Sequence, residues 1–133
     1  MKYLLDTNTC IFALRNKRPA VADHIRRTAD EEIAISTVTV AELRFGADKS
    51  DDPEVNHDKV SKFLMPFDIL PFDSGAADRY GEIRADLERR GQPIGPLDML
   101  LAAHALSKGL IFVTHNTSEF QRVKGLQLED WFG

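Results

Sequence analysis

Short apolar runs alternate along this chain with segments whose apolar residues recur every three or four positions. The apolar runs predict strands at 3–5, 33–35, 68–72, 110–114 and 126–128. The segments between them predict helices near 8–14, 19–29, 39–47, 53–67, 74–87, 97–107 and 118–122. The run at 68–72 contains a proline, which places that strand at an edge or end of the sheet. This alternation is typical of an α/β domain with a mainly parallel sheet.

Turn and cap residues predict where several helices begin and end. Asn8 or Thr9, and later Ser74, are candidate caps because short polar side chains accept hydrogen bonds from the first free N–H groups of a helix. Gly91 and Gly109 are expected to end the two helices that follow residue 74. One helical stripe is predicted to face the core; its members are Val60, Phe63, Leu64 and Phe67.

The length and composition indicate one globular domain over residues 1–133. The chain is 43% hydrophobic and 29% charged, and no apolar run approaches the roughly 20 residues of a membrane-spanning helix. Asp6 interrupts the first apolar run after only three residues, so we expect no signal peptide and a cytoplasmic location. Cys10 is the only cysteine, which excludes an internal disulfide and a zinc site that needs two thiolates.

The net charge of −4 gives no support for nonspecific binding to nucleic acid. Any such role must come from local basic clusters, which more often are ordinary solvated helix faces. The candidate clusters are Arg15 with Lys17 and Arg18, Arg26 with Arg27, Arg84 with Arg89 and Arg90, and Arg122 with Lys124.

Four acidic or amide side chains occupy positions that folding alone does not explain. Asp6 ends the first strand, and Asn116 follows two residues after the strand that ends at Thr114. Ligands of open α/β sheets bind beyond the carboxyl ends of the strands, although Asp is also a common cap residue. Glu42 and Asp98 fall within apolar helical stripes, where an unpaired carboxylate is costly. We therefore expect these side chains to pair with a cation or to line a cleft.

Three carboxylates that converge on one pocket repel one another strongly, and a hard divalent cation relieves this repulsion. The four histidines show no metal-ligand spacing, so oxygen ligands favour Mg²⁺ or Mn²⁺ over zinc. Such ions suit phosphodiester hydrolysis because they orient water and neutralise charge on the phosphate oxygens. Asp6, Glu42 and Asp98 are therefore the candidate metal ligands.

Four segments of the sequence resemble the motif blocks of one family. They are LLDTN at 4–8, TVAELRFGA at 39–47, GPLDMLLAAHA at 95–105 and VTHNTSEF at 113–120. In this order and spacing they resemble the PIN domain, specifically the VapC toxin branch of toxin–antitoxin pairs. The resemblance covers essentially the whole chain. It implies a three-layer α/β/α sandwich with a central, mainly parallel sheet. It also implies metal-dependent endoribonuclease activity.

The resemblance also implies roles for individual residues. Asp6, Glu42 and Asp98 match the family's three Mg²⁺-binding acids, and Asn116 stands where many relatives have Asp. Glu119, three residues later, is a candidate replacement for that missing charge, so both residues are candidates for the catalytic group. The polar positions beside the acids match Thr7, Asn8 and Thr114. The candidates for holding substrate phosphates are Arg15 and Arg84.

The resemblance further implies the partners of the chain. These are an RNA substrate, a VapB-type antitoxin that blocks the site, a second copy in a homodimer, and operator DNA bound only through the antitoxin. Similarity to enterobacterial members makes initiator tRNA, cut in its anticodon stem-loop, the expected substrate. The alternatives are a PIN-like binding module without catalysis, which the neutral Asn116 favours, and a phosphoryl-transfer domain. The second acidic residue that a phosphatase pattern expects is replaced by Asn8.

Overall fold

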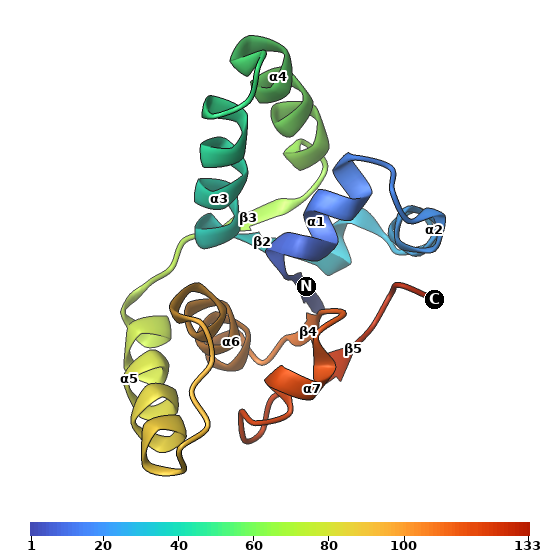
Figure 1. Ribbon diagram of the computed structural model, residues 1–133. Helices are drawn as coiled ribbons and strands as arrows, with labels where there is room; N and C mark the ends of the chain where they lie inside the picture. Colours follow the sequence, from blue (N-terminus) through green and yellow to red (C-terminus); the bar gives the residue numbers. More distant parts are fainter.

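A five-stranded parallel sheet forms the centre of the molecule in a computed structural model that describes residues 1–133 (Figure 1). The strand order is β3-β2-β1-β4-β5, so the first strand of the chain lies in the middle of the sheet. Every neighbouring pair is parallel. The strands are β1 (Tyr3–Leu5), β2 (Ile33–Ser36), β3 (Asp68–Leu70), β4 (Ile111–Val113) and β5 (Leu128–Glu129). The predictions of a parallel sheet and of an edge position for β3 are confirmed.

Helices cover both faces of the sheet. Figure 1 shows α3 and α4 side by side above the sheet, with α1 and α2 beside them, while α5 and α6 pack together on the opposite side. The helices are α1 (Thr7–Leu14), α2 (Pro19–Arg27), α3 (Thr37–Asp48), α4 (Pro53–Leu64), α5 (Ser74–Arg89), α6 (Pro96–Lys108) and α7 (Thr117–Phe120). A short 3-10 turn, Asp30–Glu32, precedes β2. The predicted three-layer α/β/α sandwich is confirmed.

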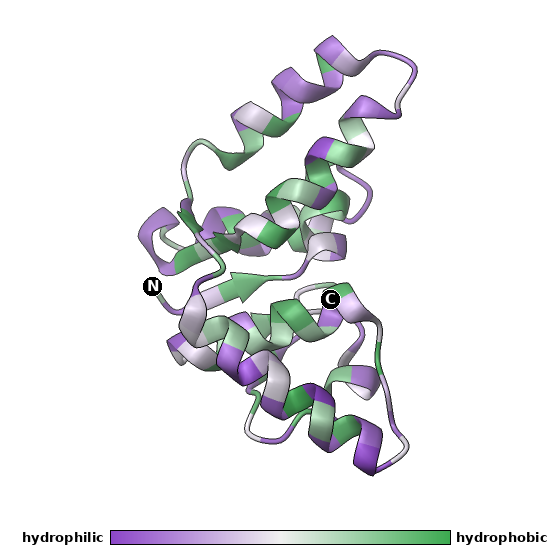
Figure 2. Cartoon of the chain, turned by 90° about the vertical axis from the view of Figure 1, so that its left-hand side faces the viewer, coloured by the Kyte–Doolittle hydropathy of each residue, from purple (hydrophilic) through white to green (hydrophobic).

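Alternating residues of the strands divide the core into two clusters. Leu4, Ala34 and Phe112 pack with α5, α6 and α7, whereas their chain neighbours Leu5 and Val113 pack with α1, α3 and α4. All five are fully buried, and burial of a leucine or phenylalanine side chain stabilises the fold by about 1.5–3 kcal/mol. Figure 2 shows hydrophobic residues along the strands and hydrophilic ones at the helix ends far from the sheet.

Two predicted helix caps are wrong by one or more residues. Asp6, not Asn8 or Thr9, caps α1, because its carboxylate accepts a 2.8 Å hydrogen bond from the Thr9 N–H. Asp73, not Ser74, caps α5 in the same way, with a 3.0 Å bond from the Ala76 N–H. A carboxylate at the N-terminus of a helix also interacts favourably with the helix dipole.

Other boundaries differ by small amounts. α4 ends at Leu64, so Phe67 packs against Phe63 from the following turn and not from the helix itself. β5 begins at Leu128, two residues later than predicted. Gly91 and Gly109 follow the ends of α5 and α6 with φ of 67° and 65°, which confirms both predicted ends. None of the helices combines the length and apolar character that crossing a bilayer requires.

Candidate active site

Asp6 is fixed at the carboxyl end of the central strand. It is buried, it caps α1 through Thr9, and Thr114 at the end of β4 also hydrogen-bonds its side chain. Burial raises the pKa of Asp6, and these hydrogen bonds oppose the increase because they stabilise the carboxylate. Asp130, near the chain terminus, contributes a further negative charge that raises this pKa. Asp6 and Thr114 therefore lie together at the carboxyl ends of β1 and β4, the region in which the strand-end argument places Asp6 and Asn116.

Glu42 on α3 is held by a hydroxyl from α1. The Thr7 hydroxyl lies 2.6 Å from one Glu42 carboxylate oxygen and 3.0 Å from the Thr39 hydroxyl. The reasoning that placed Glu42 in a buried apolar stripe is wrong, since Phe45 on the same face is 65% exposed. Glu42 is half-buried because it lies at the junction of α1 and α3. The contact with Thr7 orients its carboxylate.

Asp98 lies in the first turn of α6, and its environment opposes ionisation. Its pKa is raised to about 6, first by burial and then by the negative charges of Glu119, Asp6 and Glu42. Carboxylates from three other parts of the chain are therefore close enough to Asp98 to oppose its ionisation. This electrostatic coupling is the feature that marks the place as a site.

Asn116 and Glu119 belong to one short segment after β4. The Asn116 amide donates a hydrogen bond to the Glu119 carboxylate, and the Asn116 N–H donates to the Thr114 hydroxyl at 3.0 Å. After burial, the negative charge of Glu119 contributes most to the raised pKa of Asp98. Glu119 thus brings a negative charge to the region where Asn116 has none.

Asp6 and Glu42 each line a separate cavity. One, of about 400 Å³, is lined by Asp6, Asn116 and the exposed Asn8 among others. The other, of about 490 Å³, lies between α1 and the α3–α4 pair and is lined by Glu42 and Arg15 among others. Arg15 therefore lies beside the candidate site, as the sequence analysis expected.

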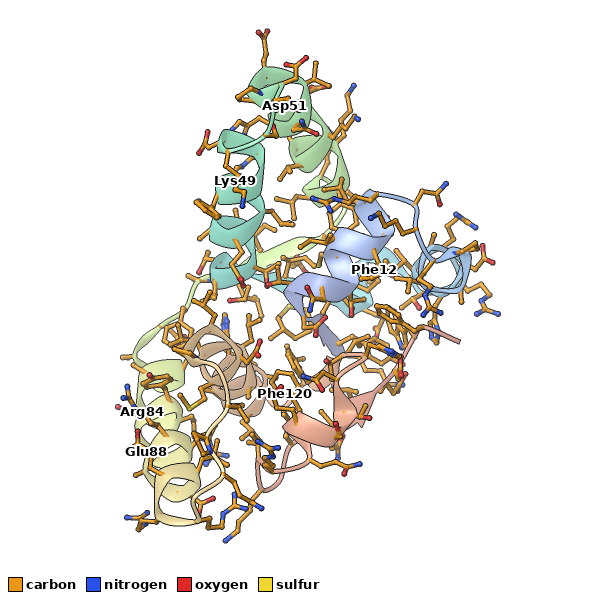
Figure 3. All side chains as sticks on the ribbon, viewed as in Figure 1. Phe12, Lys49, Asp51, Arg84, Glu88 and Phe120 are labelled. Atoms are coloured by element: carbon orange, nitrogen blue, oxygen red, sulfur yellow. The ribbon has the colours of Figure 1, made fainter.

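Arg84 lines neither of these cavities, so its suggested role in phosphate binding stays a prediction. Figure 3 shows Arg84 on α5, at the far side of the molecule from Phe12. Its guanidinium group donates hydrogen bonds to Glu88 at 2.9 Å and to the Tyr80 hydroxyl at 3.1 Å, both on the same helix. The charge of Arg84 stabilises the surface of α5 and does not face a carboxylate of the site.

Sequence reasoning missed the residues that position the acids. Thr39 and Thr9 are fully buried and contact Thr7 and Asp6 respectively. Lys17 and Lys59 line the same cavity as Arg15, but Lys59 comes from α4, a helix that carried no candidate. Polar residues flanking an acid at a strand end could have indicated Thr9. Nothing in the sequence pattern points to Lys59.

Comparison with known proteins identifies the scaffold. The family model described as PIN domain matches residues 3–126. This chain belongs to the PIN-domain family. Within it the chain falls among the VapC ribonucleases, since it is 47% identical over 98% of both chains to the tRNA(fMet)-specific endonuclease VapC of Shigella flexneri. The predicted family is confirmed.

Solved structures of PIN-domain complexes match over nearly the whole length. DNA-bound VapBC from Salmonella typhimurium has a TM-score of 0.93 and 43% identity, and covers 98% of both chains. VapBC2 from Rickettsia felis, bound to a DNA fragment from its promoter, has a TM-score of 0.92 and 36% identity, and covers 98% of this chain and 99% of that one. The arrangement of strands and helices is thus the one found in VapBC complexes.

PIN-domain nucleases use divalent metal ions, and the donor set of this PIN domain fits such an ion. No Lys, Arg or His side chain forms an ion pair with Asp6, Glu42 or Asp98, so no salt bridge within the chain relieves their mutual repulsion. The donors of these three side chains are hard oxygens, which Mg²⁺ and Mn²⁺ prefer. The His, Cys, Asp and Glu side chains do not gather in any group of three that could hold a metal ion as they stand. The carboxylates form an open acidic group that a cation would neutralise.

Proposed function

We propose that this chain, as a single PIN domain over residues 1–133, is the toxin of a toxin–antitoxin pair and hydrolyses phosphodiester bonds of RNA with the help of Mg²⁺. The observation that carries the proposal is the electrostatic coupling of Asp98 to Glu119, Asp6 and Glu42 without a cationic partner. A group of carboxylates that destabilise one another is costly unless it serves to bind a cation.

Asp6 and Asp98 are the main ligands for this ion, and Glu42 positions the ion or a water molecule. Mn²⁺, which has similar ligand preferences, substitutes for Mg²⁺. A bound divalent ion makes water more acidic and neutralises the charge that develops on phosphate oxygens during hydrolysis. Thr7 orients Glu42, while Thr9 and Thr114 orient Asp6. Hydrogen bonds of this kind fix the direction of a ligand and tune its basicity.

Asn116 and Glu119 together replace the fourth acid that many PIN domains have at the position of Asn116. The exposed Asn116 amide is available to contact a phosphate or the ribose, since it carries no charge that would repel them. Glu119 supplies the negative charge, and its hydrogen bond with Asn116 keeps the two side chains together. Asn8 borders the same cavity as Asn116 and is a second amide that can contact substrate.

Three cations around the cavity beside Glu42 bind the RNA backbone. Arg15, Lys17 and Lys59 line this cavity of about 490 Å³, and none of them forms an ion pair within the chain. Unpaired cations next to an acidic group attract the phosphates that flank a reacting phosphodiester. This cluster gives the surface beside Glu42 a local positive charge, although the net charge of the molecule is −4.

The substrate and partners of the relatives provide the rest of the proposal. The Shigella protein is named for action on tRNA(fMet), so we assign initiator tRNA, cut in its anticodon stem-loop, as the substrate in the cytoplasm. The VapBC complexes indicate a VapB-type antitoxin as protein partner, with promoter DNA bound through the antitoxin. A homodimer completes the assembly. A PIN-like binding module without catalysis is the second candidate, because Asn116 is neutral.

The experiment is cleavage of purified total tRNA with Mg²⁺, Mn²⁺ or EDTA, followed by mapping of the cut ends. The wild type is compared with Asp98→Asn and with the control Asp78→Asn, which removes an equal charge from an exposed position on α5. We expect one discrete cut that requires metal and Asp98 but not Asp78. Metal binding without cleavage of any RNA would favour the binding module, and cleavage by Asp98→Asn at the wild-type rate would refute the assignment.

A further inference from the structure

The cavity beside Asp6 has an aromatic wall that the proposed chemistry does not use. Its volume is about 400 Å³, and Asp6 and Asn116 lie on its acidic side. The remaining wall is formed by Phe12 from α1, Arg18 before α2, His115 after β4, and Phe132 near the chain terminus. Aromatic rings and a guanidinium group next to an acidic site are the groups that bind unstacked nucleobases and their phosphates.

Phe132 is the centre of this aromatic wall. The His115 ring stacks on it with 4.4 Å between centroids and an interplanar angle of 15°. Phe12 meets it edge-on at 4.9 Å, and the Arg18 guanidinium lies 5.5 Å from its centroid. Phe132 is itself buried, so its ring is a fixed support and not a mobile surface group.

Asp130 holds the two parts of the wall together. One of its carboxylate oxygens accepts a 2.9 Å hydrogen bond from the Phe132 N–H, and the other lies 3.0 Å from Nδ1 of His115. The imidazole is therefore fixed in the plane that stacks on Phe132. Because Phe132 covers one face and 58% of the His115 side chain is exposed, the opposite face of the imidazole is accessible.

We propose that the accessible face of His115 is a nucleobase subsite. An unpaired base next to the cleaved phosphodiester stacks on the imidazole, while Arg18 contacts the adjoining phosphate. This subsite rests on the proposed function, since it places the RNA chain across Asp6. Stacking of one base on an aromatic side chain changes binding about 5- to 150-fold.

The test is equilibrium binding in EDTA of a fluorescent single-stranded RNA oligonucleotide with the sequence of a tRNA anticodon loop, compared with copies that carry one abasic nucleotide. Binding in EDTA needs no cleavage, so the result does not depend on catalysis. We expect His115→Ala to weaken binding about 5- to 150-fold and His115→Tyr to retain affinity within about threefold, because an aromatic face is kept. One abasic position should weaken binding to the wild type and have no further effect on His115→Ala.

The matched control is His24→Ala, which removes an imidazole that stacks on Trp131 at 4.1 Å outside this cavity. It should bind the oligonucleotide like the wild type. Equal affinity of wild type and His115→Ala for every oligonucleotide would overturn the subsite, whereas cleavage that still needs Asp98 would leave the proposed function intact. If His115→Ala prevents inhibition by a VapB-type antitoxin but not RNA binding, the cavity belongs to the protein partner and the nucleobase assignment is wrong.

Discussion

The Thr7 hydroxyl donates a 2.6 Å hydrogen bond to the Glu42 carboxylate and so joins the start of α1 to the middle of α3. An ionised carboxylate only accepts hydrogen bonds, so the single proton of Thr7 is used in this contact. The 3.0 Å contact between the Thr7 and Thr39 hydroxyls must then be donated by Thr39. Thr39 thus donates a hydrogen bond to Thr7, and Thr7 donates one to Glu42.

The first prediction concerns Thr7, the middle residue of this series of hydrogen bonds. Thr7→Val keeps the shape of the side chain but removes the hydroxyl, which frees Glu42 and leaves the buried Thr39 hydroxyl without its partner. We expect RNA cleavage to fall about 10- to 100-fold, as for other partners of metal ligands. Thr7→Ser restores the hydroxyl and should retain most activity. Equal single-turnover rates for Thr7→Val and wild type would show that Glu42 needs no orientation.

The second prediction is that one substitution has opposite effects on stability and activity. Asp98→Asn removes a charge that burial and three neighbouring acids disfavour. In EDTA at pH 7.5 it should raise the free energy of unfolding by roughly 1 kcal/mol, less than the full pKa shift implies because solvent screens a half-buried group. The same protein should not cleave RNA.

The control for this measurement is Asp78→Asn on the exposed side of α5, which should leave unfolding nearly unchanged. Urea denaturation of the three proteins under identical conditions gives the comparison. A destabilised Asp98→Asn would mean that its carboxylate makes a favourable contact that outweighs the repulsion.

The third prediction is stabilisation by the metal. A ligand that binds only the folded state at 100 times its dissociation constant stabilises by about 2.7 kcal/mol. Mg²⁺ and Mn²⁺ should therefore raise the thermal midpoint of the wild type, and Asp98→Asn should lose most of this increase. An equal increase in both proteins would indicate that the ions act elsewhere on the surface.

The fourth prediction concerns pH and a histidine away from the acids. His104 is fully buried on α6; its Nδ1 lies 2.9 Å from the Ser36 hydroxyl, and Nε2 has no hydrogen-bond partner. Burial is the main cause that lowers its pKa. Lys108 also lowers this pKa, whereas Asp73, which pairs with Lys108, and the Pro71 backbone raise it. The folded protein therefore keeps His104 neutral at a pH where the unfolded chain is protonated.

The sign of the effect follows from proton linkage. The unfolded state binds more protons as the pH falls below about 6.5, so the free energy of unfolding should decrease, with a slope of at most about 1.4 kcal/mol per pH unit from this group. The difference between wild type and His104→Gln at each pH isolates the contribution, since all other groups are common to both. Parallel curves between pH 7.5 and 5.5 would contradict the prediction.

The sequence predicted the layers and most of the acidic group because both depend on local patterns. β1 and β4 are short apolar runs followed by polar residues, and the parallel topology brings their carboxyl ends to one edge. Asp6 and Thr114 therefore meet, although they lie far apart in the sequence. Asp98 was found because a single acid in an otherwise apolar helix has no structural explanation.

Features that depend on contacts between distant helices were not predictable. The apolar stripe predicted around Glu42 is wrong, whereas the resemblance to the PIN domain indicates Glu42 independently of burial. The hydrogen-bond partner of Glu42, Thr7, comes from another helix. Arg84 and Lys59 are equally plausible cations in the sequence, but packing places only Lys59 beside the site. Helical periodicity indicates which side of a helix faces the core, whereas it does not indicate which other helix lies opposite.

The central position of β1 has a consequence for synthesis of the chain. Its first residues pair both with β2 and with β4, and Leu5 lies opposite Val113. During translation β1 must wait for a partner from the last fifth of the molecule before the sheet can close. Before residues 114–120 have been synthesised, the nascent chain contains Asp6 but neither Thr114 nor α7. The surroundings of Asp6 are therefore assembled only after β4 and Thr114 have been synthesised.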